Sequence, residues 1–234
     1  GTGAVQTAIQ VATLLNETFS TLSVEELGWP AYKALAGAGR LRFEEFPSVG
    51  VAQGDGVLPL YQAGPMNTTG RVPSPEVVNA RVQAAKSSGL PLVLDRAYSG
   101  FEYARLLGNL SYAEVMRKSF QAQVQPFIDA GIPFALALSP TKAFVTFSLR
   151  PCGFLLVFHP DRNTVQALGP RLGGLLRARG SSFVHPITRA FVKAMVRDRP
   201  RLEEEHVQAL SRNGEAETQW QVLTKGTPME ALFS

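Results

Sequence analysis

The sequence is poor in cysteine, with Cys152 as its only one among 234 residues. A single cysteine excludes an internal disulfide framework and a zinc site built from several cysteines, and it suits a reducing compartment. Long apolar runs are also lacking, since none approaches the roughly 20 residues that a membrane-spanning helix needs. A basic-then-apolar leader is missing at the N-terminus. We therefore expect a soluble, cytoplasmic protein with no membrane partner.

Histidine and excess charge are scarce as well. His159, His185 and His206 show no metal-ligand spacing with one another or with Cys152, so no metal site is predicted. Nothing local supports a Ser–His–acid or Cys–His nucleophile. The net charge is +4, from 23 basic and 19 acidic residues, and the densest basic group, around 171–179, is short. Scattered charge of this kind is typical of a solvated basic face, so we expect no nucleic-acid partner.

Apolar residues make up 45% of the chain, enough for one large core or two smaller ones. Hydrophobic periodicity predicts strands over 40–46, 56–62, 90–95, 134–138 and 153–158. It predicts helices over 5–15, 74–88, 111–130, 164–179, 186–197 and 201–210, with a short one ending at 35–39. Capping-box residues Ser23–Glu26 predict a further helical turn, Pro126 a kink, and Gly169-Pro170 a helix break. Strands that alternate with helices predict an α/β protein, with a mainly parallel sheet in a three-layer α/β/α arrangement.

Two apolar runs end in polar side chains that such runs rarely carry. The run 90–94 stops at Asp95, with Tyr98 three residues on, and the run 133–138 stops at Ser139, with Lys142 and Arg150 beyond it. Residues just past the ends of parallel strands lie at the carboxyl edge of the sheet, where α/β proteins bind ligands. Together these groups suit a ligand with a basic ring nitrogen, a phosphate and a carbonyl that an amine can trap.

Each of these residues also fits a simpler interpretation. A lysine amine traps an aldehyde when it is held nearby and partly deprotonated, and Ser139 with Arg150 can bind one phosphate, yet the same pattern fits an ordinary surface loop. Asp95 would keep a pyridine nitrogen protonated, or it caps the next element. Asn67 lies in a turn, where asparagine usually serves the backbone. Trp29 can stack on an aromatic ligand or pack in the core.

In this order, the motifs resemble those of the class I aminotransferases, fold-type I enzymes that use pyridoxal 5'-phosphate, and above all their aspartate and aromatic amino-acid branch. Gly1-Thr2-Gly3 resembles the family's Gly-Thr-Gly, Trp29-Pro-Ala-Tyr resembles Trp-x-Asn-His, and Asn67-Thr-Thr-Gly70 resembles Asn-Pro-Thr-Gly. Asp95-Arg-Ala-Tyr98-Ser-Gly-Phe resembles Asp-x-Ala-Tyr-Gln-Gly-Phe. Ser139-Pro-Thr-Lys142 with Arg150 resembles Ser-x-x-Lys followed by arginine. They span residues 1 to about 153.

The resemblance implies a role for each matching residue. Lys142 would form an aldimine, or Schiff base, with the cofactor and carry the proton between the substrate and the cofactor. Asp95 would hold the pyridinium nitrogen, Trp29 would stack on the ring, and Asn67 and Tyr98 would hydrogen-bond its phenolic oxygen. The residues implied at the phosphate are Gly1, Thr2, Ser139 and Arg150.

The resemblance also implies domains and partners. Residues 1–180 would form the cofactor-binding large domain, and 181–234 a helical segment that leads towards an incomplete small domain. The substrates would be an amino acid and a 2-oxo acid, and the assembly a homodimer. The chain departs from the family pattern at Thr68, which replaces a proline, and at Ala31 and Tyr32, which replace Asn-His and leave substrate recognition there open. The substrate amino acid is not predicted, and no arginine for its α-carboxylate is identified among the 92 residues after Lys142 (234 − 142).

Two other functions remain open at this stage. Another fold-type I enzyme, a lyase or a synthase, would use the same lysine and aspartate and differ only in its substrate contacts. A non-catalytic, aminotransferase-like effector domain of a regulator would also keep the cofactor-binding residues. The expected function is nevertheless amino-group transfer.

Overall fold

A computed structural model describes residues 1–47, 50–144, 146, 152–180 and 184–227. Its centre is a six-stranded sheet of order β2-β1-β3-β4-β5-β6. The neighbours from β2 to β5 pair in parallel, and only β6 runs antiparallel, against β5. The strands are β1 Thr21–Glu25, β2 Arg42–Phe46, β3 Val57–Gln62, β4 Leu92–Arg96, β5 Phe134–Leu138 and β6 Phe154–Phe158. The predicted α/β class and mainly parallel sheet are confirmed.

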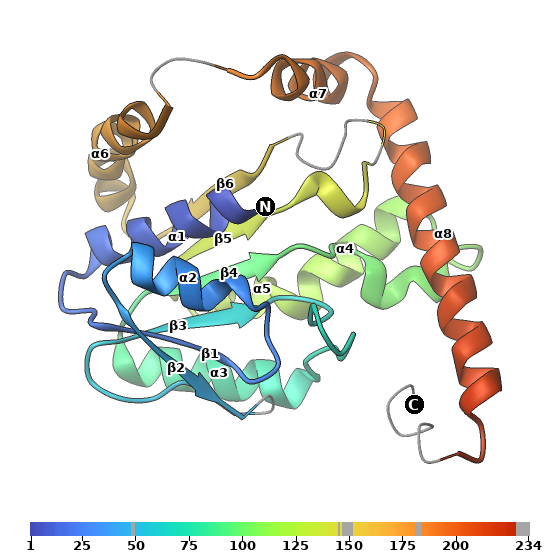
Figure 1. Cartoon of the computed structure of the whole chain (residues 1–234), viewed down its shortest axis with the longest axis horizontal. Helices are drawn as coiled ribbons and strands as arrows, with labels where there is room; N and C mark the ends of the chain where they lie inside the picture. Colours follow the sequence, from blue (N-terminus) through green and yellow to red (C-terminus); the bar gives the residue numbers. More distant parts are fainter. Residues whose placement is uncertain (48–49, 145, 147–151, 181–183, 228–234) are drawn as a thin grey trace.

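Helices cover both faces of this sheet (Figure 1). On one face, α1 (Thr2–Leu15) and α2 (Ala31–Ala38) bury alanine, valine and isoleucine side chains against the strands. On the other face, α3 (Pro75–Ser88) and α5 (Gln125–Asp129) close a second apolar cluster. Two cores, one on each side of the sheet, make the three layers that the sequence predicts. Burial at about 25 cal/mol per Å² of apolar surface is the main force that holds these layers together.

The remaining helices surround this centre. They are η1 (Phe101–Leu106), α4 (Tyr112–Gln123), η2 (Pro140–Lys142), α6 (Arg162–Gly180), α7 (Pro186–Arg197) and α8 (Arg199–Thr224). In Figure 1, α7 and the long α8 lie outside the layers, at the edge of the molecule. The helical character predicted after residue 180 is confirmed for α7 and α8, whereas the division into two domains at that point stays a prediction.

Four expectations about local structure need correction or refinement. The expected helical turn at Ser23–Glu26 is wrong, because Thr21–Glu25 is a strand with all five residues buried between β2 and β3. The expected break at Gly169-Pro170 is also wrong: α6 continues through Pro170, and Leu168 and Leu172 on either side of it pack on the core beside α1. The kink near Pro126 is a full break at Val124, where α4 ends and α5 begins. Helix α8 continues 14 residues beyond its predicted end at Leu210, to Thr224.

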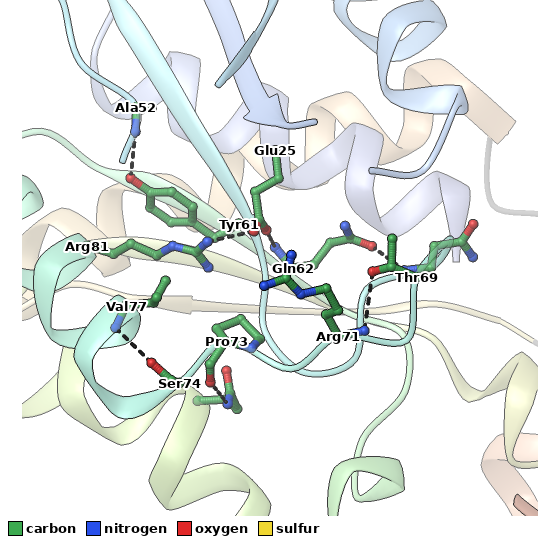
Figure 2. A network of polar contacts seen from close by, with 12 residues as sticks. Glu25, Ala52, Tyr61, Gln62, Thr69, Arg71, Pro73, Ser74, Val77 and Arg81 are labelled. Carbon is green, nitrogen blue, oxygen red and sulfur yellow. Dashed lines mark hydrogen bonds and ion pairs between the residues drawn. The ribbon is translucent and has the colours of Figure 1, made fainter. Parts of the chain in front are cut away.

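A buried ion pair explains how a glutamate ends a fully buried strand. Oε1 of Glu25 lies 2.6 Å from Nη2 of Arg81 on α3, and the two side chains are 1% and 2% exposed. The guanidinium of Arg81 also lies 4.6 Å from the centre of the Tyr61 ring (Figure 2). Burial raises the pKa of the Glu25 carboxyl, and the charge of Arg81 opposes that rise. Charges without water need such partners, and the capping-box pattern alone does not reveal them.

Candidate functional site

A cavity of about 970 Å³ opens at the carboxyl edge of the parallel strands. It lies where β3, β4 and β5 end and where the N-terminus of α1 meets them, which is the usual place for a ligand in this kind of sheet. Eight of the nine residues predicted for the site line this one cavity: Gly1, Thr2, Trp29, Asn67, Asp95, Tyr98, Ser139 and Lys142. The ninth, Arg150, lies outside the described residues.

Asp95 is the buried acid of the cavity. It lies in β4 and is 8% exposed, and one of its oxygens, Oδ2, accepts a hydrogen bond of 2.8 Å from the hydroxyl of Tyr32. Burial raises the pKa of Asp95 to about 6, although the bond from Tyr32 acts in the opposite direction. A carboxyl group in this state gains from a cationic donor, because such a partner offsets the loss of hydration. Asp95 therefore fits a ligand with a protonated nitrogen.

Lys142, Tyr98 and Asn67 form a second group on the cavity wall. Lys142 ends η2, and its Nζ lies 5.6 Å from the centre of the Tyr98 ring. The Tyr98 hydroxyl in turn accepts a hydrogen bond of 2.8 Å from Nδ2 of Asn67. An amine, a phenol and an amide thus gather on one wall, and Asp95 lines the same cavity. This set of groups can hold a carbonyl carbon near the amine and donate to an oxygen beside it.

The N-terminus of α1 lines the cavity and is suited to an anion. Gly1 caps this 14-residue helix without a side-chain hydrogen bond, and helix N-termini attract phosphate because their backbone N–H groups and dipole face it. A Cβ built on Gly1 would lie 3.4 Å from Oγ of Ser139, so serine and helix end are adjacent. A Cβ built on Gly153 would lie 2.8 Å from Cβ of Ala4 and from the Gly1 nitrogen. Glycine at 153 is therefore what lets β6 begin so close to this helix.

Trp29 lies beside the cavity and packs edge-on against Tyr32, with ring centres 5.5 Å apart. Thr68, which stands where the family pattern has proline, donates its hydroxyl hydrogen bond to the backbone carbonyl of Leu27. This bond joins the Asn67 turn to the loop that carries Trp29. Threonine in place of proline at position 68 therefore still allows the Asn67 turn to lie next to the loop of Trp29.

Three residues in or next to the cavity were not predicted from the sequence as part of the site. Tyr32 was noted only as a departure from the family pattern, and its bond to Asp95 joins residues 63 positions apart. Gln62, at the end of β3, is 6% exposed and lines the cavity beside Asp95. Cys152 lines it as well, and burial raises the pKa of its thiol. A strand-end glutamine next to a strand-end aspartate is a signal that the sequence did contain.

Helix α8 braces the segments that carry Lys142 and Tyr98. Glu205 accepts two hydrogen bonds from Thr146, one of 2.9 Å from its backbone N–H and one of 2.7 Å from its hydroxyl. His206 packs between the rings of Phe101 and Phe144, at 6.1 and 5.5 Å. Burial lowers the pKa of His206 to about 4, so its imidazole is neutral at pH 7.

The described residues hold neither a metal-binding cluster nor a membrane-spanning helix. No group of three or more histidine, cysteine, aspartate or glutamate side chains in these ranges could hold a metal ion. Among the same residues, no helix is long and apolar enough to span a membrane.

Comparisons with known proteins point to one family. The model of the family described as aminotransferase class I and II matches residues 1–217. Among curated protein sequences, none matches significantly.

Solved structures of aminotransferases have a similar fold. An aromatic-amino-acid aminotransferase from Burkholderia pseudomallei, covalently bound to pyridoxal phosphate, superposes with a TM-score of 0.75 at 19% identity, over 94% of this chain and 55% of that one. The broad specificity aminotransferase from Leishmania mexicana gives 0.75 at 19%, over 99% and 60%. Aspartate aminotransferase of Plasmodium falciparum gives 0.72 at 16%, over 95% and 55%. The chain thus spans 55–60% of the length of these structures, and the likeness establishes a shared fold.

Proposed function

Because the chain belongs to the class I and II aminotransferase family, we propose that it binds pyridoxal 5'-phosphate and serves the transfer of an amino group from an amino acid to a 2-oxo acid. One observation supports this proposal above all: a lysine amine and a buried carboxyl group line the same cavity at the carboxyl edge of the sheet. When bound, the cofactor supplies an aldehyde that an amine can trap and a ring that withdraws electrons from the substrate.

Lys142 is proposed as the catalytic residue. Its exposed amine, above the Tyr98 ring, would hold the cofactor between turnovers and then move a proton from and to the substrate Cα. Asn67 and Tyr98 would donate to the phenolic oxygen next to the reacting carbon. Their own 2.8 Å contact keeps the amide and the hydroxyl together.

The other residues would bind and orient the ring. Asp95 would accept a hydrogen bond from the protonated ring nitrogen, because a carboxyl group with a pKa raised to about 6 by burial regains its charge beside a cation. Gly1, Thr2 and Ser139 would hold the phosphate at the start of α1, and Trp29 would cover the ring. Arg150 stays a predicted phosphate ligand outside the described residues.

Tyr32 is proposed to support Asp95. In Tyr32→Phe the ring that packs on Trp29 remains, but the hydrogen bond to the Asp95 carboxylate is lost. We expect kcat/KM to fall about 10-fold, since a hydrogen bond to a charged group contributes about 1.5–3 kcal/mol. Steady-state kinetics would measure the fall. Tyr61→Phe removes a similar buried hydroxyl, which accepts from the Ala52 N–H away from the cavity, and serves as the control. Equal efficiencies for wild type and Tyr32→Phe would contradict this role.

The proposed function is tested by absorbance. Purified protein titrated with pyridoxal phosphate should develop the red-shifted band of lysine-bound cofactor at one equivalent per chain. Aspartate or aromatic amino acids, added singly without a 2-oxo acid, should then bleach the band and release the matching 2-oxo acid in equal amount. No band at a large cofactor excess would contradict cofactor binding, and a band that no amino acid bleaches would contradict amino-group transfer.

The same titration separates the two alternative functions. A lyase or synthase would form product while the band persists, and an effector domain would show the band without turnover. The matching family and the matching structures are aminotransferases, which does not favour either alternative.

The assembly and the compartment are further proposals. A homodimer rests on the family resemblance, and sedimentation of the purified chain tests it. A cytoplasmic location rests on the single cysteine, which suits a reducing compartment.

A further inference from the structure

Gln62 occupies a position between the two groups of cavity residues. It ends β3, and in the register of the parallel pair its Cα lies opposite that of Asp95 on β4. Its side-chain oxygen, Oε1, accepts a hydrogen bond of 3.0 Å from the backbone N–H of Asn67. Gln62 thus lies beside Asp95, which is proposed to bind the ring nitrogen, and it also holds Asn67, which is proposed to bind the phenolic oxygen.

The backbone of Gln62 is itself fixed from behind. Its N–H donates a 3.3 Å hydrogen bond to Oε2 of Glu25, and the other oxygen of Glu25 pairs with Arg81 at 2.6 Å (Figure 2). Both charged side chains are almost fully buried. These hydrogen bonds connect the end of β3 to β1 and α3, so the position of Gln62 is set by three elements.

Asn67, by contrast, lies in an exposed turn. The turn closes through bonds from the Met66 N–H to the Arg71 carbonyl and from the Gly70 N–H to the Met66 carbonyl. Apart from the 2.8 Å bond to Tyr98, the contact with Gln62 is what ties Asn67 itself to the rigid sheet. The glutamine side chain therefore helps to hold the Asn67 backbone, and with it the side-chain amide that contacts Tyr98.

The side-chain nitrogen of Gln62, unlike its oxygen, is unpaired among the described residues. Its amide nitrogen, Nε2, is buried and has no hydrogen-bond partner among the described residues, although the residue lines the cavity. Buried donors are rarely left unpaired in folded proteins. An unpaired one in a cavity wall is explained when a ligand supplies the acceptor.

We propose that Gln62 is the positioning residue of the Asn67–Tyr98 pair, and that through this pair it sets the proton affinity of the lysine-bound cofactor. The inference rests on the proposed function. The charged and titratable groups around it are Glu25 from β1, Arg81 from α3, Asp95 from β4, and Tyr98 and Lys142 from the loops that follow β4 and β5.

Gln62→Met tests the inference, since methionine keeps the length of the side chain but neither accepts from Asn67 nor donates. The variant should still bind the cofactor covalently. The pH midpoint of its absorbance titration should rise by about one unit, a tenfold change in the acid dissociation constant, because Asn67 and Tyr98 no longer align on the phenolic oxygen. Gln83→Met, on the exposed side of α3, is the matched control and should leave the midpoint unchanged.

A double-mutant cycle shows whether the effect passes through Asn67. In an Asn67→Ala background, Gln62→Met should produce no further rise of the midpoint, because the residue that it positions is already gone. The same rise in both backgrounds would overturn the inference, as would a Gln62→Met midpoint equal to that of wild type. Gln62→Asn, with an amide one methylene too short to reach Asn67, serves as a second variant if Gln62→Met folds poorly.

A measurement without the cofactor separates this inference from the proposed function. In the apoprotein, hydrogen exchange at the Asn67 backbone N–H should be at least about 10-fold faster in Gln62→Met than in wild type, because a native hydrogen bond is lost. Unchanged exchange would contradict the positioning role even if the cofactor binds. A wild-type protein that never forms the absorbance band would instead contradict the proposed function, whatever the exchange rate.

Discussion

Lys142→Ala is expected to abolish covalent attachment of pyridoxal phosphate and to lower amino-group transfer by at least about a thousandfold. Loss of a proton-transfer group alone lowers the rate by about 10²–10⁴-fold. Loss of covalent attachment lowers it further. The alanine variant should fold normally, because Lys142 is exposed and its amine lies over the face of the Tyr98 ring.

The measurement combines absorbance with mass spectrometry. After reduction with borohydride, wild-type protein should gain the mass of one cofactor on the peptide that contains Lys142, and the variant should gain none. Lys86→Ala, at an exposed lysine in the last turn of α3, should behave as wild type. A reduced adduct of equal yield in Lys142→Ala would place the reactive amine elsewhere and overturn the assignment.

Asp95→Asn is expected to make the apoprotein more stable and the loaded protein much less active. The pKa of Asp95 is raised to about 6 by burial in the native state, against about 3.9 in an unfolded chain. The native state therefore holds this proton more tightly, so the contribution of the group is most favourable below about pH 4 and is lost as pH rises to about 6. The gap of about two units corresponds to about 3 kcal/mol at neutral pH.

Asparagine does not titrate and can still accept the hydrogen bond from Tyr32. The difference in unfolding free energy between Asp95→Asn and wild type should therefore grow by up to about 3 kcal/mol from pH 4 to pH 7. Urea denaturation of both apoproteins across this range measures it, and taking the difference removes the contribution of other titrating groups such as His206. Asp55→Asn, at an exposed carboxylate, should show no such trend.

Activity should change in the opposite direction. Without the carboxylate the ring nitrogen loses the partner that keeps it protonated, and kcat should fall by at least about a hundredfold, in line with about 3 kcal/mol for a lost buried charge-assisted bond. An Asp95→Asn variant that keeps wild-type kcat would contradict the role of Asp95. A difference in stability that does not depend on pH would contradict its raised pKa.

Much of the site could be predicted because its residues follow the ends of buried strands. The runs that form β4 and β5 are almost wholly apolar, so Asp95 and Ser139 stand out at their ends, and parallel pairing brings those ends together. Most helices follow apolar periodicity, and α3 and α4 begin after the N-cap serines Ser74 and Ser111. Local patterns of this kind need no knowledge of the tertiary fold.

The rest depended on contacts between distant parts of the chain. Ser23–Glu26 has the residues of a capping box. The buried strand forms there because Arg81, 56 positions after Glu25, neutralises the charge of that glutamate. Tyr32 and Asp95 are 63 positions apart, and Thr146 and Glu205 are 59 apart. Periodicity reports which side of an element is apolar, but it does not report which polar groups meet across the fold.

The contacts of α8 have a mechanical consequence. Glu205 accepts two hydrogen bonds from Thr146, and His206 contacts the rings of Phe101 and Phe144, so α8 is attached to the segment after Lys142 and to the segment after Tyr98. Its 26 residues reach about 39 Å at 1.5 Å per residue. A displacement of α8 would therefore disturb both of these segments.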